Sequence, residues 1–307
     1  RYITYLKNCF KSKREAFMKL KEINLINFRN YKEAKLELNP GINIFIGDNG
    51  SGKTNILEAI YVLSLTKSSR YGTDLDLIKH EESNLQVEGN VTFDDYEKKY
   101  KVTIDKFTKR VYINGNQIKK ISDYISEFCV TSFLPNDIEI IKGAPSVRRN
   151  LLNIQIGLLY NNYLKHVNEY NSLLKIRNEY LKRINLNGQA DTKYLDIINS
   201  KMIDVSVKIY YFRFFYISEI NKILPKIYKK LTGISDIKVD YQNSLGIIEY
   251  DETSIREIMQ KKYKKNLYKE MMQGMTLTGL HRDDLVFLVN NLDAKIYASQ
   301  EIGRAHV

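Results

Sequence analysis

The most informative segment of the chain is Gly47-Asp48-Asn49-Gly50-Ser51-Gly52-Lys53-Thr54. It has the form G-x-x-x-x-G-K-T, which is the Walker A pattern. A short apolar, β-branched run at Ile42–Ile46 precedes it, and apolar residues at helical spacing follow it from Thr54 to Leu65. The sequence therefore predicts a buried central strand over 42–46, a glycine-rich loop and then a helix.

The residue types in this loop suit the binding of a nucleotide triphosphate. Glycines let the backbone turn so that consecutive N–H groups point inward, and the following helix adds the positive end of its dipole. Lys53 brings an ammonium to the β- and γ-phosphates, and the Thr54 hydroxyl is a ligand for Mg²⁺. A glycine-rich turn without a ligand is the alternative. The predicted ATP-binding residues are Gly47, Asp48, Asn49, Gly50, Ser51, Gly52, Lys53 and Thr54, with Thr54 also as the metal ligand.

The hydrophobic pattern around the loop predicts a sheet. Apolar and polar residues alternate over Lys19–Phe28, and Asn114-Gly115 is a strong two-residue hairpin turn. An antiparallel β-meander is therefore expected after the first helix. The expected strands are Ala34–Leu38, Leu85–Phe93, Tyr100–Asp105, Arg110–Ile113 and Val130–Phe133, with a short helix at Ile121–Phe128.

From Pro145 onward the spacing of apolar residues changes to three and four. Proline suits the first turn of a helix, where its missing N–H costs nothing. One helix is expected to run from Pro145 to Ile184, and a second from Thr192 to Leu224, where Pro225 ends it. The polar loop between them predicts an antiparallel helix pair. The remaining expected elements are strands at Ile237–Tyr241, Leu285–Val289 and Lys295–Ala298 and a helix at Ser254–Met272.

Composition narrows the class of protein. The 48 basic and 36 acidic residues give a net charge of +12, which attracts polyanions such as nucleic acid. The abundance of Lys, Ile, Asn and Tyr is also typical of AT-rich coding sequence, whatever the function. Residues 150–232 hold 13 basic and 6 acidic side chains, so their surface is either a DNA groove or a solvated face. Two cysteines are too few for a disulfide framework, and there is no apolar run of about 18 residues or secretory signal, so a cytoplasmic protein is expected.

Two features of the helical part have competing interpretations. The aromatic run Tyr210–Tyr216 either packs in a core or stacks on nucleic-acid bases, and its helical spacing favours the core. His281 is the other. A lone histidine is more often a structural hydrogen-bonding group than a catalytic base, and we predict that role for it.

Five segments resemble the RecF family, which belongs to the SMC-like branch of the ABC ATPases. They are Met18–Tyr31, Gly47–Tyr61, Phe133–Asp137, Lys142–Arg149 and Thr278–Asp284, the last with Leu280 in place of the family's proline. The resemblance implies an α/β fold: a P-loop ABC-type ATPase head with a mixed sheet and β-meander, plus a helical lobe containing a long antiparallel helix pair. The head is expected at 18–149, the helical lobe at 150–275 and a return to the head at 276–300. Residues 1–17 are expected to be a non-native extension, with a short ordered helix as the alternative, and 301–307 a cloning scar.

The chain also departs from the family pattern. In His281-Arg282-Asp283-Asp284 the acids precede the apolar run Leu285–Val289, the wrong order for a Walker B strand. Tyr297–Gln300 resembles the start of the family's signature segment, but the expected Gly-Gln-x-Arg does not follow. The sequence thus predicts an incomplete copy without signature and Walker B motifs. We predict no catalytic residue in this chain. ATP turnover is weak in the family, and the sequence does not predict whether this chain retains it.

The resemblance implies an ATP-dependent DNA-binding protein of recombinational repair and replication. Such proteins form ATP-dependent homodimers, bind single-stranded or gapped duplex DNA, and assist RecA loading at gaps with RecO and RecR after DNA damage and in the SOS response. The candidates for DNA or inter-lobe contacts are Arg70, Arg148, Arg149 and Arg282, for each of which an internal salt bridge is an equal alternative. Two other functions stay open: a P-loop enzyme acting on a small molecule, and a non-catalytic nucleotide-binding fragment.

Overall fold

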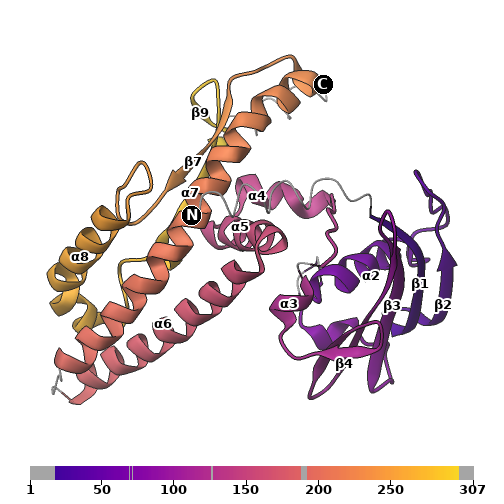
Figure 1. Ribbon diagram of the computed structural model, residues 1–307, viewed down its shortest axis with the longest axis horizontal. Helices are drawn as coiled ribbons and strands as arrows, with labels where there is room; N and C mark the ends of the chain where they lie inside the picture. The colour runs from indigo at the N-terminus through magenta and orange to yellow at the C-terminus, as the bar shows by residue number, and fades with distance from the viewer. Residues whose placement is uncertain (1–17, 69, 71, 126, 188–191, 297–307) are drawn as a thin grey trace. The chain divides into compact units, whose positions relative to one another are not determined.

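A computed structural model describes residues 18–296 except 69, 71, 126 and 188–191 (Figure 1). The chain forms two compact units. Unit one comprises residues up to 133 together with 157–161, and unit two comprises 134–156 and the residues from 162 onward. The proposals for 1–17 and 301–307 lie outside the described residues. None of the described helices is both long and apolar enough to cross a membrane.

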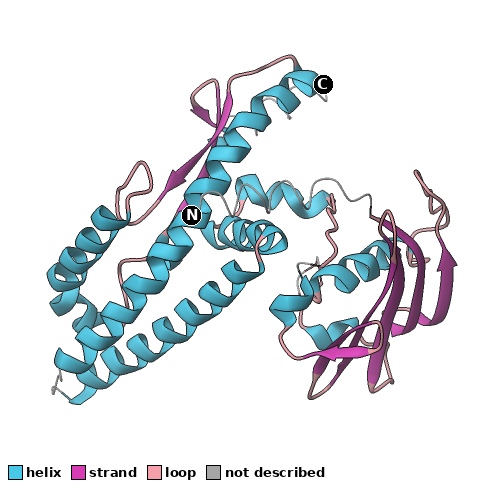
Figure 2. Cartoon of the chain, viewed as in Figure 1, coloured by secondary structure: helices cyan, strands magenta, loops and turns pink. Residues whose placement is uncertain are grey.

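Unit one is built on a six-stranded sheet in the order β2-β1-β3-β4-β5-β6 (Figures 1 and 2). All of its strand pairs are antiparallel. Asn114 and Gly115 have φ of 50° and 80° and join β5 to β6 by the two-residue turn that the sequence predicted. The α/β class and the β-meander are confirmed, but the sheet is antiparallel and not mixed over the described strands. The strands are β1 Lys19–Phe28, β2 Tyr31–Glu37, β3 Asn84–Thr92, β4 Glu97–Asp105, β5 Lys109–Ile113 and β6 Asn116–Ile118.

Helix α2 (Lys53–Leu65) packs on this sheet because its apolar residues and every second residue of the strands face one another. The approach is close at Gly89 of β3. A Cβ added there would lie 2.6 Å from Leu63 Cδ2. The fully buried core includes Ile23, Leu25, Val62, Leu63, Val87, Val91, Val102 and Val111. The short elements that follow are η1 Asp74–Leu77, α3 Ile121–Ile125, η2 Pro135–Ile138 and α4 Glu139–Lys142.

The predicted buried strand at 42–46 is wrong. Its residues form no strand, and Ile42, Ile44 and Ile46 are 88%, 77% and 91% exposed. The physical reason is the absence of a neighbour: β1 is already paired on both edges, by β2 and β3, and no other described strand adjoins this run. The strand predicted at 130–133 is also wrong, since that segment is irregular.

Unit two contains four longer helices and a small sheet. The helices are α5 Pro145–Leu159, α6 Asn161–Asn187, α7 Thr192–Thr232 and α8 Glu252–Gln273. The antiparallel pair α6–α7 is confirmed, because Leu181 and Ile184 of α6 pack on Leu195 of α7 (Figure 1). Strands β7 Ile237–Gln242, β8 Asp284–Val289 and β9 Leu292–Asp293 form an antiparallel sheet, and η3 Leu280–Arg282 precedes β8. Lys295 and Ile296 are helical, so the strand predicted there is wrong within the described residues.

Two helix ends differ from the prediction. The helix expected from Pro145 to Ile184 is interrupted at Tyr160, which is not helical. Pro225, expected to end α7, lies inside it. The turn that loses its backbone bond there is supported from outside: Asn221 donates to the Val239 carbonyl and accepts from the Val239 N–H, each at 2.8 Å. The prediction that the aromatic run packs in a core is confirmed for Tyr210 and Phe212, which are buried.

Candidate nucleotide-binding site

The Walker A loop leads into α2 through a backbone that requires glycine. Gly50 and Gly52 have φ of 85° and 102°, in the left-handed region that L-residues with side chains rarely adopt. Gly52 is the N-cap of α2, and a Cβ there would lie 2.6 Å from the Asn30 side-chain nitrogen and 2.7 Å from the Tyr31 hydroxyl. Glycine at 52 therefore meets both a conformational and a steric demand.

The loop presents a set of free backbone donors. Among the described residues, the N–H groups of Gly50, Gly52, Lys53 and Thr54 have no hydrogen-bond acceptor, whereas Ser51 N–H bonds to the Asp48 carbonyl at 3.2 Å. No side chain caps the start of α2, and its first turn carries no acid. Such a helix start is an anion site, because the dipole and the unpaired donors act together.

Lys53 is held at the loop. Its Nζ donates to the carbonyl oxygens of Gly47 and Asp48, at 2.6 and 2.7 Å. The Thr54 side chain is exposed at the mouth of the loop. The residues therefore fit a phosphate chain and its cation: donors and an ammonium for the oxygens, and a hydroxyl for Mg²⁺. No group of three or more His, Cys, Asp or Glu side chains suited to a metal was found in the described parts of the chain.

The β1–β2 hairpin supports the loop. The sequence did not predict this contact. Asn30 Nδ2 donates to the Ser51 carbonyl at 3.4 Å, and Asn30 Oδ1 accepts from Asn55 Nδ2 at 2.8 Å. Asn30 and Tyr31 thus lie directly against Gly52. Both lie in a segment that resembles the family, which was the only signal available for them.

A buried carboxylate ties the hairpin to α2. Glu58 accepts from Arg29 Nε at 3.0 Å and Arg29 Nη2 at 2.8 Å, and from the Ser68 hydroxyl at 2.5 Å. Burial alone would raise the pKa of Glu58, but the bonds from Arg29 and Ser68 hold it below its usual value. Glu58 is therefore a charged anchor one turn beyond Thr54, and it fixes the hairpin that supports the loop.

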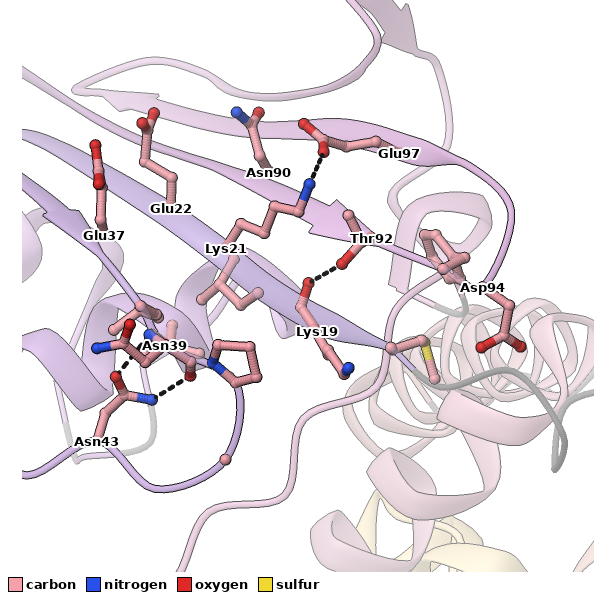
Figure 3. A pocket seen from close by; sticks show the side chains of 17 residues that line it. Lys19, Lys21, Glu22, Glu37, Asn39, Asn43, Asn90, Thr92, Asp94 and Glu97 are labelled. Atoms are coloured by element: carbon pink, nitrogen blue, oxygen red, sulfur yellow. Dashed lines mark hydrogen bonds and ion pairs between the residues drawn. The ribbon is translucent and has the colours of Figure 1, made fainter.

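A cavity lies elsewhere in unit one (Figure 3). It has a volume of about 1040 Å³ and is lined by the ends of β1, β2 and β3 and the turn at 39–43. Its charged lining residues are the acids Glu22, Glu37, Asp94 and Glu97 and the lysines Lys19 and Lys21, and Lys21 is paired with Glu97 at 2.9 Å. Because acids outnumber lysines in this lining, it suits a triphosphate less well than the loop does.

The four arginine candidates have different surroundings. Arg148 is buried, with Nε and Nη2 on the Asp284 carboxylate at 2.7 and 2.9 Å, and Arg149 donates to the Asp283 carbonyl at 2.8 Å. Burial alone would raise the pKa of Asp284, yet Arg148 holds it below its usual value. The Arg148 guanidinium is thus enclosed in an internal ion pair, the alternative that the sequence left open for it.

The other two arginines are more accessible. Arg70 is half-buried and lies 3.7 Å from Glu58. Arg282 is exposed and donates to the Thr276 carbonyl at 3.2 Å, with no carboxylate partner among the described residues. These two stay candidates for contact with DNA.

His281 has a structural environment. Its Nδ1 lies 2.8 Å from the Tyr170 hydroxyl and its Nε2 lies 3.0 Å from the Thr276 carbonyl oxygen. Burial lowers the pKa of the ring below its ordinary value. Both ring nitrogens are thus engaged by α6 and by the segment before η3, which confirms the predicted structural role.

Comparison with known proteins gives one consistent result. Residues 19–138 match the family "RecF/RecN/SMC N terminal domain". The chain is 34% identical over 285 residues to the DNA replication and repair protein RecF of Staphylococcus carnosus, covering 92% of this chain and 77% of that protein. The RecF of Lactobacillus johnsonii is 34% identical over 287 residues, with 92% and 76% covered. A solved structure described as the recombination mediator protein RecF-ATPrS in the RecFOR pathway has a TM-score of 0.87 at 34% identity, with 94% and 78% covered.

Proposed function

Because the chain belongs to the RecF family, we propose that it binds Mg²⁺ and ATP at the Walker A loop and couples nucleotide binding to DNA binding in replication and repair. The observation that carries the proposal is the row of free N–H groups at Gly50, Gly52, Lys53 and Thr54. They form an anion site, and solved relatives are described as RecF bound to ATP and to ATPrS.

In this proposal each part of the loop has a separate task. The free amides bind the phosphate oxygens, and the Lys53 ammonium exchanges the Gly47 and Asp48 carbonyls for the β- and γ-phosphates. The Thr54 hydroxyl ligates Mg²⁺. The hairpin residues Asn30 and Tyr31 keep the backbone in place. Bound nucleotide contributes its negative charge and a hydrolysable γ-phosphate.

The finer parts of the function rest on the relatives. We propose action with RecO and RecR in loading RecA at gaps, in recombination, the response to DNA damage and the SOS response, as a cytoplasmic protein that dimerises on ATP. The RecFOR pathway named for the solved relative supports the partners. Exposed Arg282 and half-buried Arg70 are the proposed phosphate contacts among the four arginines. We also propose that residues 276–300 are part of the ATPase head.

The test is calorimetry with Mg-ATP on wild-type chain and on Lys53→Ala. Loss of one charge-assisted contact worth about 1.5–3 kcal/mol should weaken binding by roughly 10- to 150-fold. Lys67→Ala is the matched control, because Lys67 is an exposed lysine just after α2. Equal affinities for the Lys53 and Lys67 variants would show that the loop does not hold the phosphates. DNA binding that ignores ATP would remove the proposed coupling and leave nucleotide binding intact.

A further inference from the structure

Helix α8 of unit two has one inward and one outward face. Ile255, Met259, Tyr263 and Glu270 are buried. At the helical spacing opposite to them, Lys261, Lys264, Lys265, Tyr268, Lys269 and Met272 are exposed. The outward face thus combines four lysines with a tyrosine that is 74% exposed and a methionine that is 62% exposed.

The charge on this face is not neutralised within the described part of the chain. Lys261 has a partner, Glu257, at 3.6 Å. Lys264, Lys265 and Lys269 have no carboxylate within ion-pair distance among the described residues. Elsewhere in the unit some exposed cations are paired, as Lys222 is with Glu219 and Arg256 with Asp204, whereas others, such as Lys226 and Lys230, have no carboxylate partner among the described residues. From Lys261 to Gln273 no exposed side chain of α8 is acidic.

Internal stability does not account for these lysines. A cation stabilises a helix when it lies in the last turn, beside the negative end of the dipole. The last turn of α8 carries no basic residue. Lys262, in contrast, points inward and donates to the Ser244 carbonyl. The helix therefore uses one lysine for its own packing and leaves the others facing solvent.

A second helix extends the basic surface. Lys182 of α6 is exposed, and its side chain lies against Gly274, where a Cβ would be 2.9 Å from Lys182 Cγ. Asn185 of α6 fixes this junction by donating to the Met271 carbonyl at 3.1 Å. These residues of both helices belong to unit two.

We propose that this surface, formed by Lys182, Lys264, Lys265, Tyr268 and Lys269, binds the sugar–phosphate backbone of DNA. The inference rests on the proposed DNA-binding function and locates a contact surface for it. Lys264 to Lys269 spans about 7.5 Å of helix at 1.5 Å per residue, while duplex DNA carries one charge per about 1.7 Å of its axis. Several phosphates therefore lie within reach, and Tyr268 offers a ring to sugars or unpaired bases.

The experiment measures binding of the full chain to fluorescent duplex and single-stranded oligonucleotides by anisotropy, over a range of salt. The Lys264→Ala/Lys265→Ala/Lys269→Ala variant should bind roughly 10- to 100-fold more weakly than wild type, with a salt slope shallower by about 2 to 3. Alanine is a good helix former on an exposed face, and circular dichroism checks that the helices remain.

The matched control is Lys226→Ala/Lys229→Ala/Lys230→Ala. It removes the same charge from exposed lysines of the same unit, at the end of α7. Equal losses in both triple variants would mean that only net charge acts, and would overturn the proposed surface. Failure of wild-type chain to bind DNA at all would instead overturn the DNA-binding function itself. A loss in Tyr268→Ala confined to single strands assigns the ring to unpaired bases, and equal losses on both substrates assign it to the backbone.

Discussion

The phosphate loop of unit one and the buried ion pair of unit two hold charge in opposite ways. The loop is made of backbone, and four of the five N–H groups of residues 50–54, those of Gly50, Gly52, Lys53 and Thr54, have no acceptor among the described residues. Arg177 and Glu270 are fully buried side chains joined at 2.6 Å, and they lie 93 positions apart. A site built from neighbouring backbone amides therefore gives a recognisable sequence motif, whereas a network of side chains far apart in the sequence gives none.

In the unit-two pair, each nitrogen of the Arg177 guanidinium and each oxygen of the Glu270 carboxylate has a hydrogen-bond partner. Arg177 also donates to Asn199 and to the Thr276 hydroxyl, each at 2.8 Å, and its guanidinium lies 4.7 Å from the Tyr263 ring centre. The second oxygen of Glu270 accepts from the Leu277 N–H at 2.7 Å. The network thus joins α6, α7, α8 and the segment after α8, so its loss affects the whole unit.

The largest effect is expected from Glu270→Ala. Removing one partner leaves Arg177 charged and buried without a counter-ion, which typically costs about 3–5 kcal/mol of stability. Urea unfolding measures this loss. Glu257→Ala, an exposed acid on the same helix, should stay within about 0.5 kcal/mol of wild type. A Glu270 variant as stable as the Glu257 variant would contradict the network.

Gly52→Ala is expected to affect the other region: it should weaken nucleotide binding in unit one and leave the stability of unit two unchanged. The left-handed backbone costs about 1–2 kcal/mol with a side chain, and the Cβ meets Asn30 and Tyr31. Displacement of the loop should lower nucleotide affinity by more than about 10-fold while unit two unfolds as before. Gly41→Ala is the matched control, because Gly41 has φ of 92° but nothing within 4 Å of its Cβ. Equal affinity in both variants would show that the hairpin does not shape the loop.

Sequence reasoning succeeded where the cause is local. The loop and α2 follow from spacing over 47–65, and the β5–β6 turn follows from Asn114-Gly115. It failed where the cause lies elsewhere in the chain. Ile42–Ile46 has strand composition but no adjoining strand among the described residues, and Pro225 lies inside α7, one turn after Asn221, which bonds to Val239 of β7.

The same distinction applies to the functional residues. Lys53 and Thr54 lie inside the motif, so the sequence alone was enough to propose them as nucleotide-binding residues. The sequence assigned no role to Asn30 or Glu58, because their supporting contacts, to Asn55 and Arg29, depend on which residues lie next to them in the fold. For Arg148 the sequence left open a DNA or inter-lobe contact and an internal salt bridge. Its ion-pair partner, Asp284, lies 136 positions away, so the sequence could not choose between them.

The smallest effect is expected from the pH dependence of unit two. Burial lowers the pKa of His281 in the folded chain below the ordinary value of 6.5, so the unfolded chain binds the proton more tightly. The stabilisation is therefore complete above about pH 6.5, decreases as the pH falls toward the folded pKa, and levels off below it. In His281→Gln the thermal midpoint should depend less on pH between about 7.5 and 5 than in wild type. His80→Gln, which changes an exposed histidine, should follow the wild-type curve. If His281→Gln also followed that curve, the acid sensitivity would have to come from groups other than the ring held by Tyr170 and Thr276.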